Sequence, residues 1–254
     1  MNFFFLRKIN PYFYIFLILL YKKFIILFFF VEIKKYFFLK HVKKNFKKNY
    51  KILDIGSNQG QISRLINFFF KKFFILQFDP YINKSTIIKK NIISYNFGLG
   101  KKNEKKNIYI PFYRKFILDS YISTYKSKIL SNCIRDNFNT KNIYIKKKVC
   151  IFKKLDSLKI KTFFIKIDAE GSEYDILIGS KKTIKKNNPI ILLEVNTLLE
   201  FKKINTYLTK HFNYAPFFFS KNKFQRIYFR KLAKYKICGD IFFLSKKSFK
   251  YLNS

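Results

Sequence analysis

A short apolar run, Lys51–Ile55, leads through two glycines four residues apart into a segment of helical periodicity. A strand, a tight loop and a helix start in this order form the place where α/β sheets bind nucleotides. Gly56 and Gly60 would let the backbone approach a ligand where a side chain would clash. An ordinary strand-to-helix turn is the alternative interpretation. Because the dinucleotide and triphosphate fingerprints are both absent from this loop, a different ligand is indicated.

The acid in this run narrows the class of ligand. Asp54 stands at the end of the expected strand, where a carboxylate suits a ligand that brings a cation and hydrogen-bond donors. A pyrophosphate would be repelled there. S-adenosylmethionine has a sulfonium and an α-ammonium group and meets this requirement. We therefore expect Asp54 and Gly56 to hold the methionine end of S-adenosylmethionine.

The net charge of +39, from 53 Lys and Arg against 14 Asp and Glu, would ordinarily favour nucleic-acid or anionic-membrane binding. However, nearly all the cations are lysines spread through every segment, while Phe, Ile, Asn and Tyr are also abundant and Trp is absent. Codons rich in A and T favour Lys, Phe, Ile, Asn and Tyr and disfavour Trp. We therefore attribute the charge to compositional drift and predict no nucleic-acid partner.

The cysteines and histidines give no sign of a metal or nucleophile site. Cys133, Cys150 and Cys238 are far apart, and neither they nor His41 and His211 have the spacing of metal ligands. Free thiols fit a reducing compartment. The sequence thus predicts a cytoplasmic protein without a disulfide framework.

Residues 1–48 are apolar and basic and predict an N-terminal helical segment. The two apolar runs, Pro11–Tyr21 and Phe24–Val31, are each too short to span a bilayer. Joined, they are long enough, but the two lysines between them would cost roughly 2.5–3.5 kcal/mol each. No small-residue cleavage site follows, which argues against a secretory signal. Three interpretations stay open: a helix lying on a membrane through residues 11–31, a lysine-interrupted anchor, and helices packed on the following domain.

From residue 49 the chain alternates strand and helix patterns, which predicts one α/β domain over residues 49–250 with a mostly parallel sheet. The expected strands are Ile52–Ile55, Phe73–Phe78, Ile92–Phe97, a short edge strand at Ile108–Pro111, Val149–Phe152, Phe163–Ile167, Ile190–Leu193, and a late antiparallel pair at Phe217–Phe219 and Ile241–Leu244. The expected helical segments are Gln61–Phe69, Asn83–Lys90, Leu155–Leu158, Tyr174–Ile184 and Leu198–Leu208. Residues 112–142 fit no pattern, and we expect them to cover a substrate.

Four of the expected strands end in acids: Asp54, Asp79, Asp168 and Glu194. The carboxyl ends of parallel strands face one edge of the sheet, and ligands bind at that edge. Acids also cap the helices that follow strands, which is the structural alternative. A shared site is favoured because capping alone explains Asp79 before proline and Asp168 poorly.

The spacing assigns roles to two further positions. Asp79 follows Gly60 by about 20 residues, the interval at which an acid on the second strand reaches a ribose diol. One carboxylate can accept hydrogen bonds from both hydroxyls. Gly98, after the third expected strand, would then lie against the adenine.

Five motifs, in order and at similar spacing, resemble those of the FkbM-type methyltransferases from about Lys51 to Asn196. They are Asp54-Ile-Gly56-Ser57-Asn58-Gln59-Gly60 for D-x-G-A-N-x-G, Phe78-Asp79-Pro80 for F-E-P, Asn96-Phe97-Gly98-Leu99-Gly100, Leu155-Asp156-Ser157-Leu158 followed by Lys166-Ile167-Asp168-Ala169-Glu170-Gly171-Ser172-Glu173, and Pro189 to Asn196 for P-x-x-L-x-E. The resemblance implies a Rossmann-like class I methyltransferase sandwich that uses S-adenosylmethionine. It also implies that Asn58 and Asn96 join Asp54, Gly56, Gly60, Asp79 and Gly98 in cofactor binding.

The resemblance further implies methyl transfer to a hydroxyl of a sugar, a glycolipid or a related small molecule. Alternatives are an RNA methyltransferase, favoured by the charge, and a non-catalytic relative, against which the survival of all five motifs argues. Ser57 and Asp79 replace the family's alanine and glutamate and keep the chemistry, while Tyr81 stands where the family often has asparagine. The acceptor is not implied, because residues 112–142 match nothing in the family.

A hydroxyl is a weak nucleophile and needs a base or a metal to take its proton. The candidates at the strand ends are Lys166, Asp168, Glu170 and Glu194. Asp168 is our first choice as base or divalent-metal ligand and Glu194 the second, with no metal ligand set fixed by motif. Lys166 precedes Asp168 by two residues, so both point to the same face of the strand, where the lysine can serve as a charge partner. Glu173 begins a helix, which makes it a cap or dipole partner.

Overall fold

The computed structural model describes residues 30–81, 91–228 and 239–252 of the 254-residue chain. The predictions for residues 11–29 and for a helix at Asn83–Lys90 concern residues outside these ranges. Within the described ranges, no helix combines the length and apolar character needed to cross a membrane.

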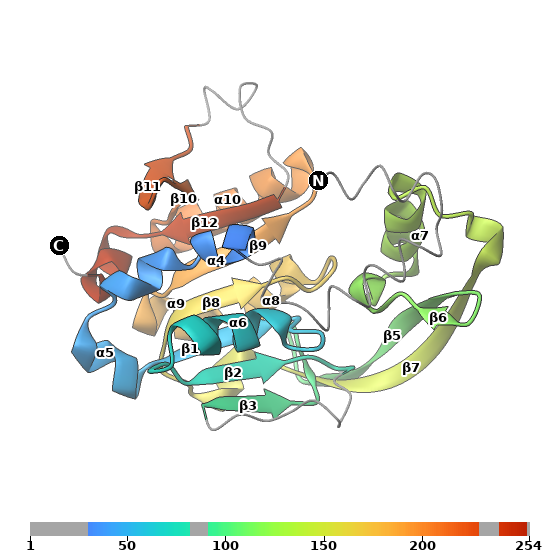
Figure 1. Cartoon of the computed structure of the whole chain (residues 1–254), viewed down its shortest axis with the longest axis horizontal. Helices are drawn as coiled ribbons and strands as arrows, with labels where there is room; N and C mark the ends of the chain where they lie inside the picture. The colour runs from blue at the N-terminus through green and yellow to red at the C-terminus, as the bar shows by residue number, and fades with distance from the viewer. Residues whose placement is uncertain (1–29, 82–90, 229–238, 253–254) are drawn as a thin grey trace.

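The main sheet has eight strands in the order β11-β10-β12-β9-β8-β1-β2-β3 (Figure 1). The strands β1, β2, β3, β8 and β9 are parallel to one another, and β12, β10 and β11 continue the sheet in antiparallel pairs. Their bounds are β1 Lys51–Ile55, β2 Ile75–Phe78, β3 Ile92–Tyr95, β8 Thr162–Ile167, β9 Ile190–Val195, β10 Ala215–Ser220, β11 Lys223–Arg226 and β12 Gly239–Leu244. This arrangement confirms the predicted α/β fold with its mostly parallel sheet and late antiparallel pair.

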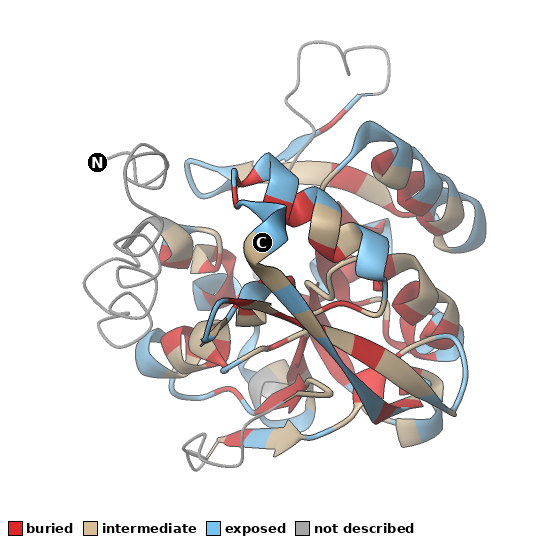
Figure 2. Cartoon of the chain, turned by 90° about the vertical axis from the view of Figure 1, so that its right-hand side faces the viewer, coloured by how far each residue is buried: buried red, intermediate tan, exposed pale blue. Residues whose placement is uncertain are grey.

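Successive strand residues point to opposite sides of the sheet, so both faces present apolar side chains. Helices cover each face and bury them. Leu53 and Ile165 belong to the core on one face, with α8 Glu173–Gly179, α9 Lys181–Asn187 and α10 Leu198–Phe212. Ile52 and Phe164 belong to the core on the other face, with α4 Phe30–Lys34, η1 Phe37–His41, α6 Gln61–Phe69 and η6 Lys246–Tyr251. Figure 2 shows the buried residues gathered in the central strands and on the inward sides of the helices.

The described part of the N-terminal segment belongs to the second of these cores. Phe38 is 1% exposed and its ring meets those of Phe164 and Phe242 edge-on at 5.1 and 5.6 Å. The short helix α5 (Lys44–Asn49) then leads into β1. The segment also meets the end of the chain, since Val42 forms an isolated bridge with Leu252 and the Lys43 amide donates to the Tyr251 carbonyl at 2.9 Å.

A second sheet, which the sequence pattern does not predict, lies beside the main one, with strands in the order β4-β7-β5-β6 (Figure 1). Its strands are β4 Gly98–Leu99, β5 Glu104–Tyr113, β6 Phe116–Ile117 and β7 Ile143–Lys153. The expected short strands at Ile108–Pro111 and Val149–Phe152 are therefore parts of two long paired strands. Residues 112–142 contribute the end of β5, β6, η2 Asp119–Tyr121, α7 Lys126–Arg135 and η3 Thr140–Asn142.

Two further expectations need correction. The strand predicted over Ile92–Phe97 ends at Tyr95, because the chain leaves the main sheet to form β4 in the second one. The single helix predicted over Tyr174–Ile184 is two helices, α8 and α9, which meet at Ser180. Gly179 ends α8, and an added Cβ there would lie 2.0 Å from the Gly100 carbonyl oxygen, so the close approach of that loop requires glycine.

Candidate active site

A cavity of about 470 Å³ lies at the carboxyl ends of β1, β2, β8 and β9, with η2 on its other side. Eight of the residues predicted from sequence line it: Gly56, Asn58, Asp79, Gly98, Lys166, Asp168, Glu170 and Glu194. The structure thus brings together residues that are up to 138 positions apart in the chain. The binding and catalytic roles predicted for them remain predictions.

Close packing explains the glycines of the loop after β1, in addition to the ligand contact predicted for them. Gly56 has a φ of +72°, and an added Cβ would lie 1.7 Å from the Asp168 carbonyl oxygen. Gly60 has a φ of +73°, does not line the cavity, and instead packs on the Gln77 amide, 2.2 Å from where its Cβ would be. Because the neighbour of Gly56 is backbone, only glycine lets the loop pass so close to the end of β8.

Asp79 closes the loop after β2 with both carboxylate oxygens. One accepts a hydrogen bond from the Asn58 amide at 2.8 Å and the other from the Tyr81 amide at 2.7 Å. Burial raises the pKa of Asp79 to about 6, and these two amides oppose the rise. Each carboxylate oxygen has further lone-pair capacity, so the side chain still has acceptors for a diol in the cavity.

The ribose role of Asp79 gives a binding prediction. Asp79→Ala should weaken S-adenosylhomocysteine binding by roughly 1.5–3 kcal/mol, measured by calorimetry, because hydrogen bonds to an ionised carboxylate are lost. Asp156→Ala is a matched control: Asp156 also accepts two backbone amides, from Lys182 and Thr183 at 2.9 and 2.8 Å, but does not line the cavity. Equal losses in the two variants would place Asp79 outside the ligand site.

Besides Gly60, two predicted cofactor residues do not line the cavity. Asn96 is exposed on the surface. Asp54 is 1% exposed and lies behind the cavity wall, where it accepts a hydrogen bond from the Ser63 hydroxyl of α6 at 2.6 Å. Its other oxygen has no hydrogen-bond partner among the described residues but lies 3.7 Å from the Lys166 ammonium.

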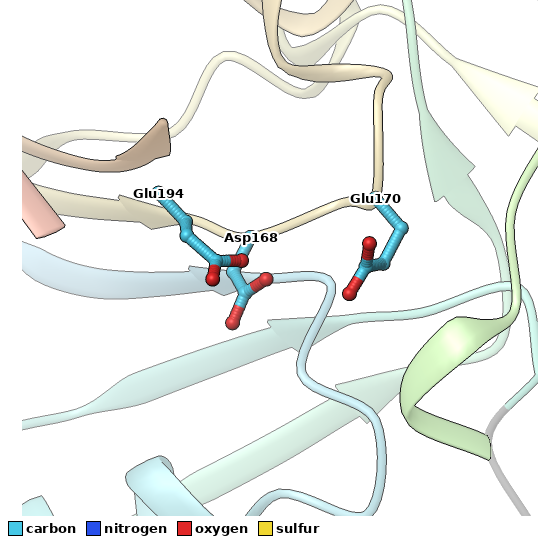
Figure 3. A group of neighbouring side chains, drawn as sticks. All are labelled: Asp168, Glu170 and Glu194. Carbon is cyan, nitrogen blue, oxygen red and sulfur yellow. The ribbon is translucent and has the colours of Figure 1, made fainter. Parts of the chain in front are cut away.

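Asp168, Glu170 and Glu194 form a cluster in which one carboxylate oxygen of each residue lies within 4.8 Å of the other two (Figure 3). Asp168 and Glu170 follow β8, and Glu194 is the last residue but one of β9. Lys166 is 6% exposed, and its ammonium lies 3.0 Å from Asp168 and so joins this cluster to Asp54. This geometry confirms that Lys166 and Asp168 face the same side of the sheet.

The pKa values of the three acids in this cluster differ. Repulsion from Asp168, together with burial, raises the pKa of Glu194 to about 9. Burial would also raise the pKa of Asp168, but the charge of Lys166 and a hydrogen bond with Glu194 lower it below the ordinary value. Burial and the neighbouring Asp168 raise the pKa of Glu170 to about 7. At neutral pH the cluster thus contains an ionised Asp168 beside a protonated Glu194.

The raised pKa of Glu194 predicts a pH-dependent stability. Between the ordinary glutamate pKa of 4.5 and about 9, the unfolded chain has lost the Glu194 proton and the folded protein keeps it. The contribution of this group to stability therefore falls as the pH rises through that window. Glu194→Gln removes the titration, so it should be more stable than the wild type by more than about 1 kcal/mol at pH 8 and less so at pH 5.

Thermal denaturation at a series of pH values measures this difference. Glu104→Gln is a suitable control, because Glu104 lies on β5, is partly exposed and pairs with the exposed Lys102 outside the cavity. A stability difference between Glu194→Gln and the wild type that stays constant with pH would contradict the shared-proton arrangement.

Comparison with known proteins identifies the family. The sequence matches the family model described as the methyltransferase FkbM domain over residues 54–224. The chain belongs to the FkbM methyltransferase family. A crystal structure of Methyltransferase FkbM from Methylobacillus flagellatus KT, at 2.20 Å resolution, is 13% identical, with a TM-score of 0.47 over 78% of this chain and 44% of that one. The chain thus spans less than half the length of that relative, and a search of curated proteins found no match.

One cavity residue that the sequence did not predict, Glu32, precedes the part of the chain that matches the FkbM family model. Glu32, on α4, lines the cavity and forms hydrogen bonds with Lys35 at 2.8 and 2.9 Å. Lys35 also bonds to Asp240, which pairs with Glu194 across β12 and β9. No motif points to Glu32, because the resemblance to FkbM proteins begins only at the first strand.

Residues 119–124 form the cavity wall opposite the sheet. None of them was predicted individually as a site residue. The Ser123 hydroxyl donates to the Glu170 carbonyl at 2.6 Å, and the Thr124 and Ser172 hydroxyls lie 2.9 Å apart. On α7, the Asn132 amide donates to the Glu170 carboxylate at 2.9 Å. These contacts join residues 123–132 to the loop after β8.

The cavity has the opposite sign of charge from the protein as a whole. Its described lining contains six acids and a single lysine, Lys166, in a chain whose net charge is +39. The acids are Glu32, Asp79, Asp119, Asp168, Glu170 and Glu194. The carboxylate oxygens of the Asp168 cluster are the type of ligand that Mg²⁺ and Ca²⁺ prefer.

Proposed function

We propose that this protein is an S-adenosylmethionine-dependent O-methyltransferase whose acceptor is a hydroxyl of a sugar, a glycolipid or a related small molecule. The observation that carries the proposal is the acid cluster of Asp168, Glu170 and Glu194, which faces the same cavity as Gly56 and Asp79. Family membership supports methyl transfer, and the cluster supports a hydroxyl as the acceptor, because a hydroxyl must lose a proton.

The residues present fit the cofactor. Ser57 lines the cavity and is 5% exposed, and its hydroxyl has no hydrogen-bond partner among the described residues. Asp79 offers acceptors for a diol, and the volume of about 470 Å³ lies in the usual range of ligand pockets. S-adenosylmethionine would supply the methyl group and its positive sulfonium, which the acidic lining would favour.

The chain's own residues would position the acceptor and take its proton. Ionised Asp168, fixed by Lys166, would accept a hydrogen bond from the acceptor hydroxyl and orient it for an in-line displacement. Glu170, with a pKa of about 7, is the group of the cluster best matched to proton transfer near neutral pH. If a divalent cation takes part, the three carboxylates of the cluster would hold it.

The lining charge supports a neutral acceptor over RNA. A polyanion would have to bring its phosphates toward six acids, against one lysine. Uncharged hydroxyls instead find acceptors in these carboxylates.

The test is transfer of a labelled methyl group from S-adenosylmethionine by the full chain to a panel of neutral oligosaccharides, glycolipids and RNA. We expect labelled product from a neutral hydroxyl acceptor and none from RNA. Product from RNA alone, or no measurable affinity for S-adenosylhomocysteine, would overturn the proposal. Loss of transfer with a chelator and recovery with Mg²⁺ or Mn²⁺ would favour a metal in the cluster, whereas indifference to the chelator would favour a protein base.

A further inference from the structure

A basic aromatic face lies at the end of α6 and beside η1, and the proposed reaction does not use it. We define this face by Phe37, Lys40, Phe68, Phe69, Lys71 and Lys72. Phe68 and Phe69 are 47% and 39% exposed, with ring centroids 5.0 Å apart. Together with Leu39 and Phe73 they line a shallow hollow between α6 and η1. Single exposed phenylalanines are common, but an adjacent pair beside an apolar hollow marks a contact surface.

The charges on this face have one sign. The hollow is lined by Lys40, Lys71 and Lys72, and its described lining contains no Asp or Glu. The Lys40 ammonium lies 4.5 Å from the Phe37 ring centroid, and nearby Lys51 lies 4.1 Å from that of Phe74. An aromatic ring with a lysine beside it is the pairing that occupies the boundary between acyl chains and headgroups.

The face is directed away from the proposed active site. Helix α6 begins next to Gly60, near the cavity, and ends at Phe69, about 13 Å further along its axis. Phe73 and Phe74 then precede the amino end of β2, whereas the cavity lies at its carboxyl end. A surface bound here would leave the cavity mouth free.

We propose that the basic aromatic face docks on an anionic lipid surface. Its lysines complement the charge of anionic headgroups, and its exposed phenylalanines suit the headgroup boundary. The sequence agrees: two long apolar runs, Pro11–Tyr21 and Phe24–Val31, lead into the described fold, which begins at Phe30, seven positions before Phe37. A single-stranded polynucleotide would use the lysines and stack its bases on exposed rings, but it would leave the apolar hollow beside them without a partner.

The absence of tryptophan from the sequence allows a site-specific test in the full chain. Phe69→Trp places one fluorophore in the face, and vesicles of phosphatidylcholine with phosphatidylglycerol are then added. We expect the emission to shift to shorter wavelength and to be quenched by brominated acyl chains. Adding Lys71→Glu and Lys72→Glu should weaken vesicle binding by more than about tenfold.

Tyr144→Trp is the matched control. Tyr144 is 58% exposed on β7, with the Lys146 ammonium 6.0 Å from its ring, so it is also an aromatic residue beside a lysine. Its emission should not change. Equal quenching in both variants would mean adsorption by overall charge and would overturn docking at this face.

Three other results would also overturn the proposal: no response of Phe69→Trp to anionic vesicles, a response to RNA in place of vesicles, or an emission that is already short in wavelength and unaffected by vesicles. The last result would mean that another part of the chain covers the face. None of these measurements depends on methyl transfer, so the proposed function can fail or succeed separately.

Discussion

Asp168→Asn should lower methyl transfer to a true acceptor by about 10²–10⁴-fold, the range for loss of a group that takes part in general acid–base catalysis. The asparagine keeps the shape of the side chain but removes the charge that Lys166 and Glu194 stabilise. Affinity for S-adenosylhomocysteine should stay close to that of the wild type, because that ligand has no acceptor hydroxyl. Single-turnover rates and calorimetry separate the two effects.

Asp175→Asn is the control for this substitution. Asp175 lies on α8 opposite Lys101 at 3.8 Å and does not line the cavity, so the same change there should leave the rate unaltered. Wild-type turnover in Asp168→Asn would exclude Asp168 both as base and as metal ligand. A loss of rate that follows a loss of cofactor affinity would move Asp168 into the cofactor site.

Gly56→Val should abolish measurable binding of S-adenosylhomocysteine and lower the melting temperature. The new Cβ would lie 1.7 Å from the Asp168 carbonyl oxygen, and a φ of +72° adds a backbone strain of about 1–2 kcal/mol for any other residue. The loop after β1 would have to move away from the end of β8, and the cavity wall would move with it. Calorimetry and thermal denaturation measure the two losses.

Gly239→Val is the control that separates the effect of the steric clash from the effect of the backbone strain. Gly239 also has a positive φ, +115°, but an added Cβ there would meet nothing within 4 Å. This variant should lose stability while keeping its affinity for S-adenosylhomocysteine. If Gly56→Val bound the ligand as the wild type does, the loop after β1 could not be the cofactor loop.

The part of the fold that the sequence predicted well is the buried parallel sheet. Strands such as β8 and β9 are buried on both faces, so they read as largely apolar runs with an acid at or just after their end. The helix α6 was predicted at its observed bounds, because it follows Gly60 and repeats its apolar residues at helical spacing. Acids placed after such strands meet at one edge, so most of the candidate site followed from the strand assignments.

The second sheet was not predicted, because β7 is largely exposed. Lys146, Lys147 and Lys148 lie in the middle of this strand and hide its alternation in a chain where lysine is abundant everywhere. The position of Asp54 was also not predicted, although the alternation of side chains along β1 indicates which face of the sheet it occupies. Ile52 packs on the face that α6 covers, so Asp54, two residues later, points to the same face and bonds to Ser63 of α6.

The contact between Val42 and Leu252 has a consequence for how the protein is made. The residues that cover one face of the sheet, from Ile33 to Val42, leave the ribosome before any strand of that sheet exists. Their partners on β8, β12 and η6 follow more than 100 residues later. Contacts of such separation close slowly, and their apolar surfaces stay exposed while the chain is incomplete. Nascent chains that stop before β12 should therefore depend on chaperones and fail to bury Phe38, although the parallel strands and the acid cluster are already complete.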